Sequence, residues 1–353
     1  ELLEGSMNLV RACEKEEVGK LILVTQRSQN ILKGDKYKMN ISKGSLWGLG
    51  RVVRTEMGKK FKCTNVDMES LDDLVEEIEM KDGTEIGWRK GARYMQKLEV
   101  DARNNKNEAG IDVELSLVYI LVGGFGGLGK QLLRWMMEKK DVKKAVLTGR
   151  SGVKMEDKNF LKEIEKEGCR VFALRMDISE RNQTEYLTQS THSSCGGRVG
   201  GLMQLALVLR DKSLLNMKWE DVKYILNVRA KGLLNVWNVL KNLKSMKWMI
   251  LYSSMSGVFG THGQMNYASS CTFMDAFAQK YDFRDRRVIS LDWGATADVG
   301  LFAKLEKEGK TLGTGALIPI PMSEIGELTN EACKSSSSQK AVFMCDWKSI
   351  QNE

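Results

Sequence analysis

Residues Val118–Lys140 read VYILVGGFGGLGKQLLRWMMEKK. The first residues are apolar and predict a buried strand, the segment Val122–Gly129 predicts a tight turn, and the remainder predicts a helix. A strand, a glycine turn and a helix in this order are typical of a dinucleotide-binding fold, because glycine lets the backbone approach a diphosphate and the helix N-terminus offers free N–H groups. The spacing of Gly123, Gly127 and Gly129 is G-x-x-x-G-x-G instead of the common G-x-G-x-x-G. By itself the motif is therefore also compatible with an ordinary turn.

Strand-like and helix-like segments alternate along the chain from this turn onward. Alternation at this spacing predicts right-handed crossovers and a doubly wound parallel sheet of the Rossmann-like α/β class. The strands are short and apolar, as expected where helices cover both faces. The predicted strands are 118–122, 144–148, 170–175, 199–205, 247–252, 287–293 and 341–345, and the predicted helices are 127–140, 156–167, 180–190, 218–245 and 264–283.

The segment before the glycine turn predicts a smaller α/β unit that has no phosphate loop of its own. The polar stretch Asp101–Gly110 is the natural linker. We therefore expect a structural subdomain that binds no cofactor over residues 1–110 and a catalytic, cofactor-binding subdomain over residues 111–353. In the first, the predicted strands are 20–25, 61–68 and 92–100, and the predicted helices are 42–58 and 71–80.

Composition excludes several classes of site. Seven cysteines without a C-x-x-C pair and only two histidines argue against a disulfide framework and a metal centre, and favour reduced thiols. The net charge of +8 is spread along the chain among nearly as many acidic residues, so we expect no nucleic-acid partner. No apolar stretch is long enough to span a membrane and no secretory leader is present, so we expect a cytoplasmic protein. The first residue is Glu1, which suggests a piece of a longer polypeptide.

The residues after the next two strands bear on the choice of dinucleotide. Arg150 and Ser151 stand where NAD enzymes carry an acid for the ribose 2′-hydroxyl, and they suit a 2′-phosphate, which favours NADPH. The alternative is a solvated arginine in a turn. Asp177 and Ile178 are placed to contact an adenine edge, and the alternative is a cap for the following helix.

Ser254 and Tyr267 could carry the chemistry. They lie thirteen residues apart, one at the end of a strand and the other at the start of a helix. A tyrosine at the strand ends can donate its phenolic proton to a carbonyl under reduction, while a serine hydroxyl holds the same oxygen. The phenol's pKa near 10 has to be lowered for this task, normally by a nearby cation. A tyrosine at a helix start is also common in simple packing.

These segments together resemble the ketoreductase domains of modular polyketide synthases and type I fatty acid synthases, which are extended short-chain dehydrogenase/reductases. The resemblance covers nearly the whole chain, with Val122 in place of the usual threonine of the glycine loop. It rests on the tryptophan motif Ser45–Arg51, the glycine loop Val122–Gly129, the segments Leu147–Gly152, Leu205–Asp211 and Tyr252–Tyr267, and the later landmarks Asp292–Gly294 and Asp346–Trp347.

The resemblance implies NADPH-dependent reduction of a β-ketoacyl thioester on an acyl carrier protein, within a megasynthase that supplies neighbouring domains. Ser254 would hold the carbonyl and Tyr267 would donate the proton. Asp211, Phe259 and Gln264 are expected to face the substrate, and the loop ending in Asp211 predicts the 3R alcohol. The implied cofactor-binding residues are Gly123, Gly124, Phe125, Gly126, Gly127, Leu128, Gly129, Arg150, Ser151, Asp177 and Ile178.

Two positions depart from the family's pattern. Arg229 stands at the position of the family's lysine, with Lys231 two residues on, and Cys271 stands at that of its asparagine. Arginine keeps the charge but cannot lend a proton, and cysteine is a poor hydrogen-bond partner. Three interpretations follow: Arg229 acts electrostatically, Lys231 is brought in by a local shift, or the domain binds NADPH and reduces poorly.

We favour an active reductase, because the glycine loop, Ser254 and Tyr267 are all present. The first alternative is a catalytically impaired, NADPH-binding structural domain of a megasynthase. The second is a free-standing reductase that acts on a diffusible substrate.

Overall fold

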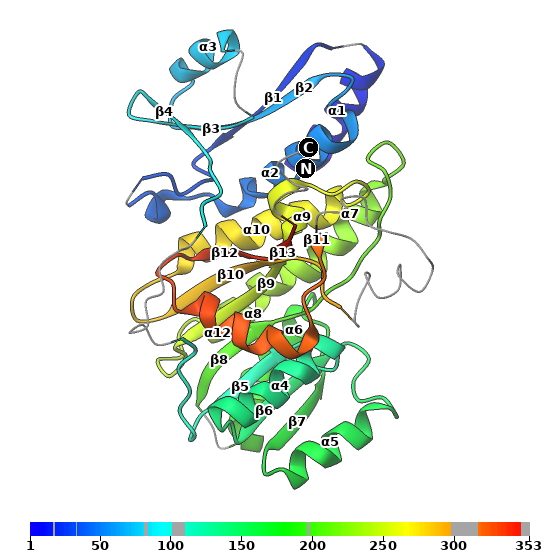
Figure 1. The fold of residues 1–353 in the computed structure, drawn as a ribbon, viewed down its shortest axis with the longest axis vertical. Helices are drawn as coiled ribbons and strands as arrows, with labels where there is room; N and C mark the ends of the chain where they lie inside the picture. Colours follow the sequence, from blue (N-terminus) through cyan, green and yellow to red (C-terminus); the bar gives the residue numbers. More distant parts are fainter. Residues whose placement is uncertain are drawn as a thin grey trace. The chain divides into compact units, whose positions relative to one another are not determined.

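The computed structural model describes residues 1–16, 18–32, 34–80, 84–100, 110–195, 198–297 and 317–346, apart from the side chains of residues 188 and 192–195. Contacts divide the chain into two compact units (Figure 1). Unit 1 comprises Glu1–Asn104, Leu209–Leu226 and Ser253–Tyr281, and unit 2 comprises Asn105–Val208, Asn227–Tyr252 and Asp282–Glu353. These units follow contacts and not the order of the chain, so the predicted division at residue 110 into structural and catalytic subdomains stays a prediction.

Unit 2 contains a seven-stranded sheet in the order β12-β10-β9-β8-β5-β6-β7. β5 pairs in parallel with β6 and β8, β6 with β7, β8 with β9, and β10 with β12. This confirms the predicted doubly wound parallel sheet. Its elements are β5 Val118–Val122, α4 Gly127–Lys140, β6 Lys144–Gly149, α5 Asp157–Lys166, β7 Arg170–Arg175, α6 Arg181–Cys195, β8 Val199–Gln204, η3 Asn227–Lys231, α8 Gly232–Leu240, β9 Trp248–Ser254, β10 Arg287–Trp293, β11 Leu317–Ile318, η4 Met322–Glu324, α12 Ile325–Cys333, β12 Gln339–Val342 and β13 Met344–Cys345.

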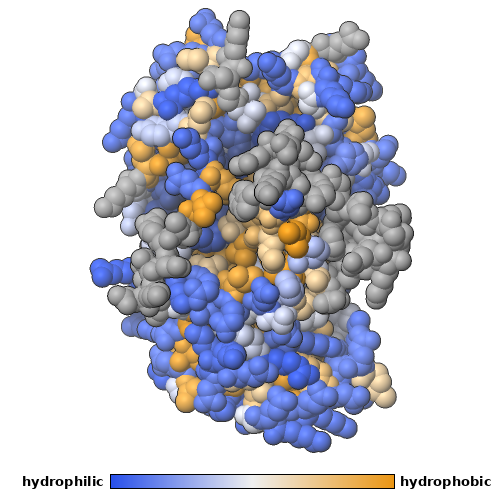
Figure 2. All heavy atoms as spheres, in the orientation of Figure 1, coloured by the Kyte–Doolittle hydropathy of each residue, from blue (hydrophilic) through white to orange (hydrophobic). Residues whose placement is uncertain are grey.

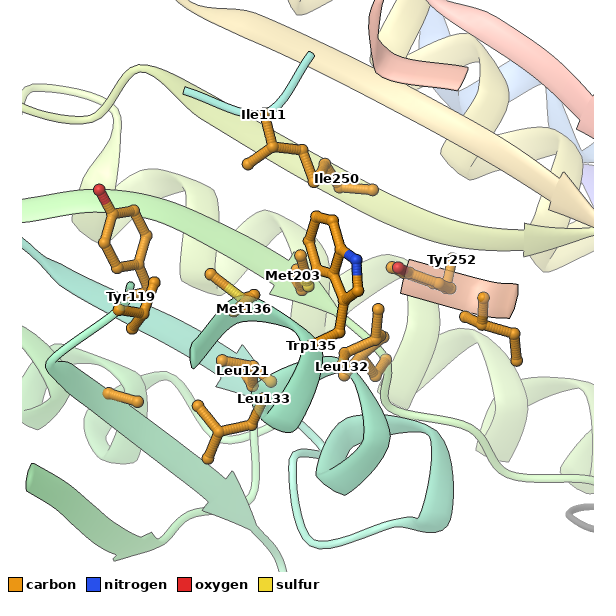
Figure 3. Close-up of a cluster of buried hydrophobic side chains, with 14 of the residues drawn as sticks. Ile111, Tyr119, Leu121, Leu132, Leu133, Trp135, Met136, Met203, Ile250 and Tyr252 are labelled. Carbon is orange, nitrogen blue, oxygen red and sulfur yellow. The ribbon is translucent and has the colours of Figure 1, made fainter. Parts of the chain in front are cut away.

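The main core of unit 2 lies between one face of this sheet and α4, α5 and α12 (Figure 3). Aromatic stacking extends along the sheet, with the ring centroids of Tyr119 and Trp248 5.6 Å apart and those of Tyr252 and Trp293 5.7 Å apart. Trp135 of α4 is buried, and its indole N–H donates to Glu327 of α12 at 3.0 Å. Because β5 and β8 are buried at every position, the opposite face is covered as well, where the crossover rule places α6 and α8.

Unit 1 contains a four-stranded sheet in the order β1-β2-β3-β4. β1, β2 and β3 are parallel, and β4 turns back antiparallel on β3 through Lys90 and Gly91, whose φ angles of 52° and 71° are those of a type I′ hairpin. Its elements are α1 Leu2–Lys15, β1 Lys20–Gln26, η1 Asp35–Lys38, η2 Ile41–Lys43, α2 Ser45–Met57, β2 Lys62–Met68, α3 Asp72–Glu79, β3 Glu85–Arg89, β4 Ala92–Met95, α7 Trp219–Leu226, α9 Met255–Phe259 and α10 Met265–Tyr281.

Several predicted elements were wrong in extent. The helix predicted over 218–245 is divided into α7 and α8 by a π-helical turn at Asn227–Lys231. The strand predicted over 92–100 ends at Met95, and its partner β3 was missed, as were α1, α9 and α12. The strand predicted over 341–345 forms two short strands, β12 and β13. Trp347 and most of the predicted linker lie outside the described residues.

Hydrophilic residues predominate on the visible face around α4 and α5 (Figure 2). Among the helices that the structure describes, none has both the length and the apolar character needed to cross a bilayer. Within the described ranges, no group of three or more histidine, cysteine and acidic side chains is arranged to hold a metal ion.

Candidate active site

The glycine turn between β5 and α4 exposes backbone that could receive an anion. Gly123, in the left-handed region at φ +80°, donates its N–H to Thr148 O at 2.9 Å, and Gly126 donates to Gly123 O at 3.1 Å. The first hydrogen bond within α4 runs from Lys130 N to Gly126 O. The N–H groups of Gly127, Leu128 and Gly129 lie in the first turn of α4, where a helix leaves its N–H groups without an intrahelical partner. Gly126 and Gly127 are exposed, so this end of the helix is open to solvent.

The same turn is too tight for side chains at two of its glycines. A Cβ added to Gly124 would lie 2.8 Å from Leu121 O, and one added to Gly129 would lie 2.6 Å from Gly124 Cα. Strand, turn and helix can pack this closely only because both residues are glycine. Phe125 and Leu128 pack against the main core of unit 2 and so anchor the turn to it. The residues present therefore fit a bound dinucleotide diphosphate.

Arg150 and Ser151 directly follow β6 and are exposed. The turn that carries them is closed by Gly152, which has a φ of +67° and donates its N–H to Gly149 O at 3.0 Å. The structure thus places a guanidinium and a hydroxyl at the carboxyl end of the strand next to the glycine turn. A contact from either to a 2′-phosphate stays a prediction.

Asp177 forms a local turn just ahead of α6. In the part of the chain that the structure describes, its side chain accepts from Ser179 and not from the N–H groups of that helix's first turn, so the cap that was the alternative for it stays a prediction. Its Oδ1 accepts hydrogen bonds from the N–H and the hydroxyl of Ser179 at 2.9 and 2.8 Å, just before α6 begins. Ile178 is buried against Gly232, where an added Cβ would lie 2.6 Å from Ile178 Cγ1. A role for both residues beside adenine stays a prediction.

Arg229 and Lys231 face different surroundings on the π-helical turn. Arg229 is only 2% exposed, and its guanidinium donates to the carbonyl oxygens of Ala206 and Tyr252, both at 3.3 Å. These carbonyls lie at the carboxyl ends of β8 and β9, where a doubly wound sheet binds its ligands. Lys231 is exposed. The structure therefore places the charge of Arg229, and not that of Lys231, inside unit 2 at the strand ends.

Ser254 and Tyr267 both belong to unit 1. Ser254 caps α9, with its Oγ accepting from Ser256 N–H at 3.2 Å. Tyr267 lies in the first turn of α10 and is buried. Cys271 follows one turn later, is fully buried, and packs against α9 so closely that a Cβ on Gly257 would lie 2.7 Å from its own Cβ.

Two of the residues expected to face the substrate, Asp211 and Gln264, are hydrogen-bonded to each other in unit 1. Gln264 donates to Asp211 Oδ2 at 2.8 Å and accepts from the hydroxyl of Ser256 at 2.9 Å. Burial raises the pKa of the Asp211 carboxyl, and the hydrogen bond from Gln264 opposes that rise without cancelling it. Phe259 ends α9 and is 52% exposed.

Comparison with known proteins identifies the family. The model of the KR domain family matches residues 118–298, which is just over half of the chain. The chain belongs to this family. It is a ketoreductase domain of the type I polyketide synthase kind. Ketoreductase domains of this short-chain dehydrogenase/reductase type bind nicotinamide cofactors of the NADPH class.

Curated relatives of the ketoreductase domain are much larger proteins. Squalestatin hexaketide synthase of Phoma sp. is 32% identical over 198 residues, which are 55% of this chain and 7% of that protein. Polyketide synthase PksN of Bacillus subtilis is 27% identical over 291 residues, 78% of this chain and 5% of that protein. The chain thus spans less than a tenth of the length of either relative.

Solved structures show the same fold. A ketoreductase domain from the bacillaene assembly line superposes with a TM-score of 0.83 at 21% identity, over 99% of this chain and 84% of that one. The first ketoreductase of the tylosin polyketide synthase gives a TM-score of 0.85 at 20% identity, over 99% and 76% of the two chains.

The tryptophan motif of this ketoreductase domain has contacts that sequence reasoning missed. Trp47 donates its indole N–H to Ser28 Oγ at 2.9 Å, and a Cβ on Gly48 would lie 2.4 Å from the carbonyl carbon of Ala268. The neighbouring Arg51 donates to the carbonyl of Gly257 in α9. Helix α2 therefore packs backbone to backbone on α10, one residue from Tyr267. The glycine spacing of the motif was the available signal, but it did not reveal which helix approaches.

Proposed function

We propose that this domain uses NADPH to reduce a β-ketoacyl thioester, carried on an acyl carrier protein, to the 3R-hydroxyacyl thioester. The observation that carries the proposal is the tight glycine turn with its exposed helix N-terminus, next to the strand end that bears Arg150. Family membership favours the reductase over a non-catalytic, cofactor-holding domain. The relatives are multidomain synthases, which supports neighbouring domains and a carrier protein as partners.

The roles we propose for the chain's residues follow from their chemistry. When bound, the cofactor supplies the hydride. The amides of Gly127, Leu128 and Gly129 and the guanidinium of Arg150 bind its phosphate groups. Ser254 holds the substrate's carbonyl oxygen, and Tyr267 donates the proton to it. Arg229 contributes a fixed positive charge at the strand ends of unit 2, although arginine itself transfers no proton.

Stereochemistry rests on the loop that contains Asp211. Its hydrogen bond with Gln264 ties this loop to the segment that leads into Tyr267, and in this proposal both loops form the surface that meets the acyl chain. We propose that this surface directs formation of the 3R alcohol. Chiral analysis that finds the 3S product would overturn this part.

The test is turnover by the purified chain with NADPH and a β-ketoacyl thioester surrogate. We expect NADPH to be consumed in step with formation of the β-hydroxyacyl product, and Tyr267→Phe to bind NADPH with little reduction. Tight NADPH binding without turnover by the unmodified chain would contradict the catalytic proposal.

A further inference from the structure

Glu56 lies in the last turn of α2 and holds two separate loops through one carboxylate. Its Oε2 accepts the N–H of Leu214 at 2.7 Å, and its Oε1 accepts the N–H of Gly263 at 2.8 Å. Leu214 lies in the loop that follows Asp211, and Gly263 lies in the loop that leads into α10 and Tyr267. Both loops and Glu56 belong to unit 1.

The two loops are also bonded to each other at this place. Lys212 donates its backbone N–H to Gly263 O at 2.8 Å, and Asn266 donates its side-chain amide to Arg210 O at 2.8 Å. With the bond from Gln264 to Asp211, these contacts form a ladder across the residues expected to face the substrate. Glu56 closes one end of this ladder.

A side chain of helix α1 holds the carbonyl group of Leu214. Arg11 donates to Leu214 O at 3.2 Å and also to the carbonyl of Met217. The Leu214 side chain is buried in the core that α1 and α2 share. The N-terminal segment thus fixes the N–H, the carbonyl and the side chain of one loop residue.

A short path leads from Glu56 to Ser254. Gly263 is followed directly by Gln264, which accepts from the hydroxyl of Ser256, and Ser256 N–H in turn donates to Ser254 Oγ. A displacement of the Gly263 peptide would therefore reach the serine that we propose holds the substrate's carbonyl. Displacements of about 1 Å at such a site can lower rates on the order of 100-fold.

We propose that Glu56 is a positioning residue for reduction: it sets the spacing of the two substrate loops and thereby the binding and facial selectivity of the acyl group. The proposal rests on the function proposed above. A carboxylate suits this task because each oxygen accepts a charge-assisted hydrogen bond from a different loop. An amide at this position keeps one acceptor oxygen and presents an NH2 group to the second N–H, so it cannot hold both loops.

The experiment compares Glu56→Gln with a control at Glu77, a buried glutamate of unit 1 that holds a different element. Glu77 accepts from Trp88 Nε1 at 3.0 Å and pairs with Arg93 at 2.8 Å, which anchors α3 without touching either loop. Each protein is assayed for KM and kcat with the acyl thioester surrogate, for the ratio of product enantiomers, for NADPH affinity and for hydrogen exchange at Leu214 and Gly263.

For Glu56→Gln we expect kcat/KM for the acyl surrogate to fall by roughly 10- to 100-fold. The minor enantiomer should increase, and NADPH affinity should stay within about two-fold. Exchange at Leu214 and Gly263 should accelerate by about ten-fold, in line with a lost hydrogen bond. For Glu77→Gln we expect lower thermal stability with the enantiomer ratio, the acyl KM and exchange at both amides unchanged.

Unchanged kinetics, product ratio and exchange in Glu56→Gln would overturn the positioning role, as would equal effects in Glu77→Gln. If the unmodified chain shows no turnover, the proposed function fails by itself. Hydrogen exchange then still decides for Glu56, since acceleration confined to the two loops supports the clamp and its absence refutes it.

Discussion

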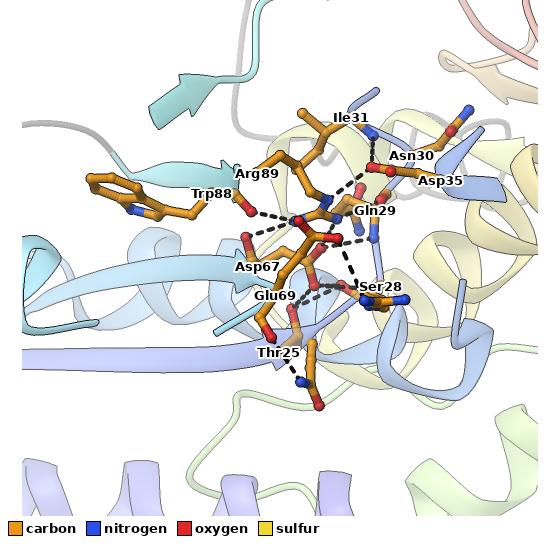
Figure 4. A network of polar contacts seen from close by, with 12 residues as sticks. Thr25, Ser28, Gln29, Asn30, Ile31, Asp35, Asp67, Glu69, Trp88 and Arg89 are labelled. Carbon is orange, nitrogen blue, oxygen red and sulfur yellow. Dashed lines mark hydrogen bonds and ion pairs between the residues drawn. The ribbon is translucent and has the colours of Figure 1, made fainter. Parts of the chain in front are cut away.

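The carboxyl ends of the parallel strands are used in opposite ways in the two units. In unit 2 the glycine turn after β5 leaves exposed backbone at this edge. In unit 1 the corresponding edge of β1, β2 and β3 is filled by the chain's own side chains (Figure 4). Asp67 accepts hydrogen bonds from Thr25 and from both the N–H and the hydroxyl of Ser28, at 2.7 to 2.9 Å, and pairs with Arg89 at 2.6 Å.

This difference shows two ways in which the strand ends of a parallel sheet can be satisfied. Strand ends of parallel sheets carry unsatisfied backbone and a crevice, which is why they bind ligands by default. Unit 1 satisfies them internally, with Asp67 fully buried and Arg89 1% exposed. Burial acts to lower the pKa of Arg89, but hydrogen bonds and charge from Asp67 and Asp35 outweigh it and raise that pKa.

The largest effect should come from opening the filled edge in unit 1. Asp67→Ala leaves Arg89 buried without its main partner, so we expect the free energy of unfolding to fall by about 3–5 kcal/mol. Urea unfolding measures it. The double variant Asp67→Ala/Arg89→Met should lose less than the sum of the single changes, because the buried guanidinium is then absent as well. A loss below about 1 kcal/mol in Asp67→Ala would show that the network does not stabilise unit 1.

Next in size is the buried arginine of unit 2, the counterpart of Arg89. We expect Arg229→Met to lower kcat on the order of 100-fold, because the fixed charge at the strand ends is lost. Arg229→Lys, which keeps a charge, should stay within about ten-fold of the unmodified chain. Lys231→Ala is the matched control and should change kcat by less than about two-fold, since Lys231 is exposed. The reverse pattern would assign the role to Lys231.

A smaller effect is expected when the open edge of unit 2 is given a negative charge. Gly126 has an extended backbone at φ −70°, and an added Cβ meets nothing closer than 3.4 Å, so Gly126→Asp should fold normally. Repulsion of the diphosphate should weaken NADPH binding by about 30-fold, or ~2 kcal/mol. Gly5→Asp, at an exposed glycine of unit 1, serves as control in the same titration. Equal affinity in both variants would place the diphosphate elsewhere.

Arg150→Ala tests which dinucleotide the open edge prefers. We expect NADPH affinity to fall by about ten-fold, since one guanidinium–phosphate contact is lost, with NADH affinity unchanged. Binding of both nucleotides is measured by fluorescence titration. An equal loss for NADH would indicate a general effect on the turn instead of recognition of the 2′-phosphate.

The smallest effect concerns Asp35, a second partner of Arg89 at the filled edge of unit 1, and the way its contribution to stability depends on pH. Burial acts to raise the pKa of Asp35, but hydrogen bonds from the Leu32 N–H and from Arg89 outweigh it and lower that pKa from 3.8. A folded-state pKa below the unfolded value means that the carboxylate stabilises the fold above pH 3.8, and that this contribution is lost as pH falls through the folded value. Asp35→Asn should therefore lower stability by about 1 kcal/mol at neutral pH, with the difference shrinking in acid. A constant difference across that range would exclude the ionised carboxyl as its cause.

Elements fixed by local pattern could be predicted from the sequence. The bounds of β5 and α4 match the prediction, because an apolar run, a glycine turn and an amphipathic helix are all local signals. The interruption between α7 and α8 could not be predicted, because the residues of the π-helical turn have ordinary helical propensities. Strand β3 was missed because it is short and its partner lies across a hairpin turn that has no Asn-Gly signal.

The types of residue in the candidate site could be predicted from the sequence. The contacts that hold these residues in place could be predicted less well. The spacing on a regular helix could not show which of Arg229 and Lys231 points inward, since the helix is not regular there. Glu56 looks like a solvated charge at the end of a helix, and its partners lie 158 and 207 residues away in the sequence. Asp67 and Arg89 carry no motif either. Contacts of this kind arise only when distant segments fold together.

The π-helical turn at Asn227–Lys231 is in effect a one-residue insertion carried inside a helix. Such an insertion shifts every side chain on its far side by about 100° around the axis. Deleting one residue here would therefore change which side chain points inward, without any substitution. An engineer who wants lysine in place of arginine at the strand ends has two separate controls: the identity of residue 229 and the length of the turn that carries it.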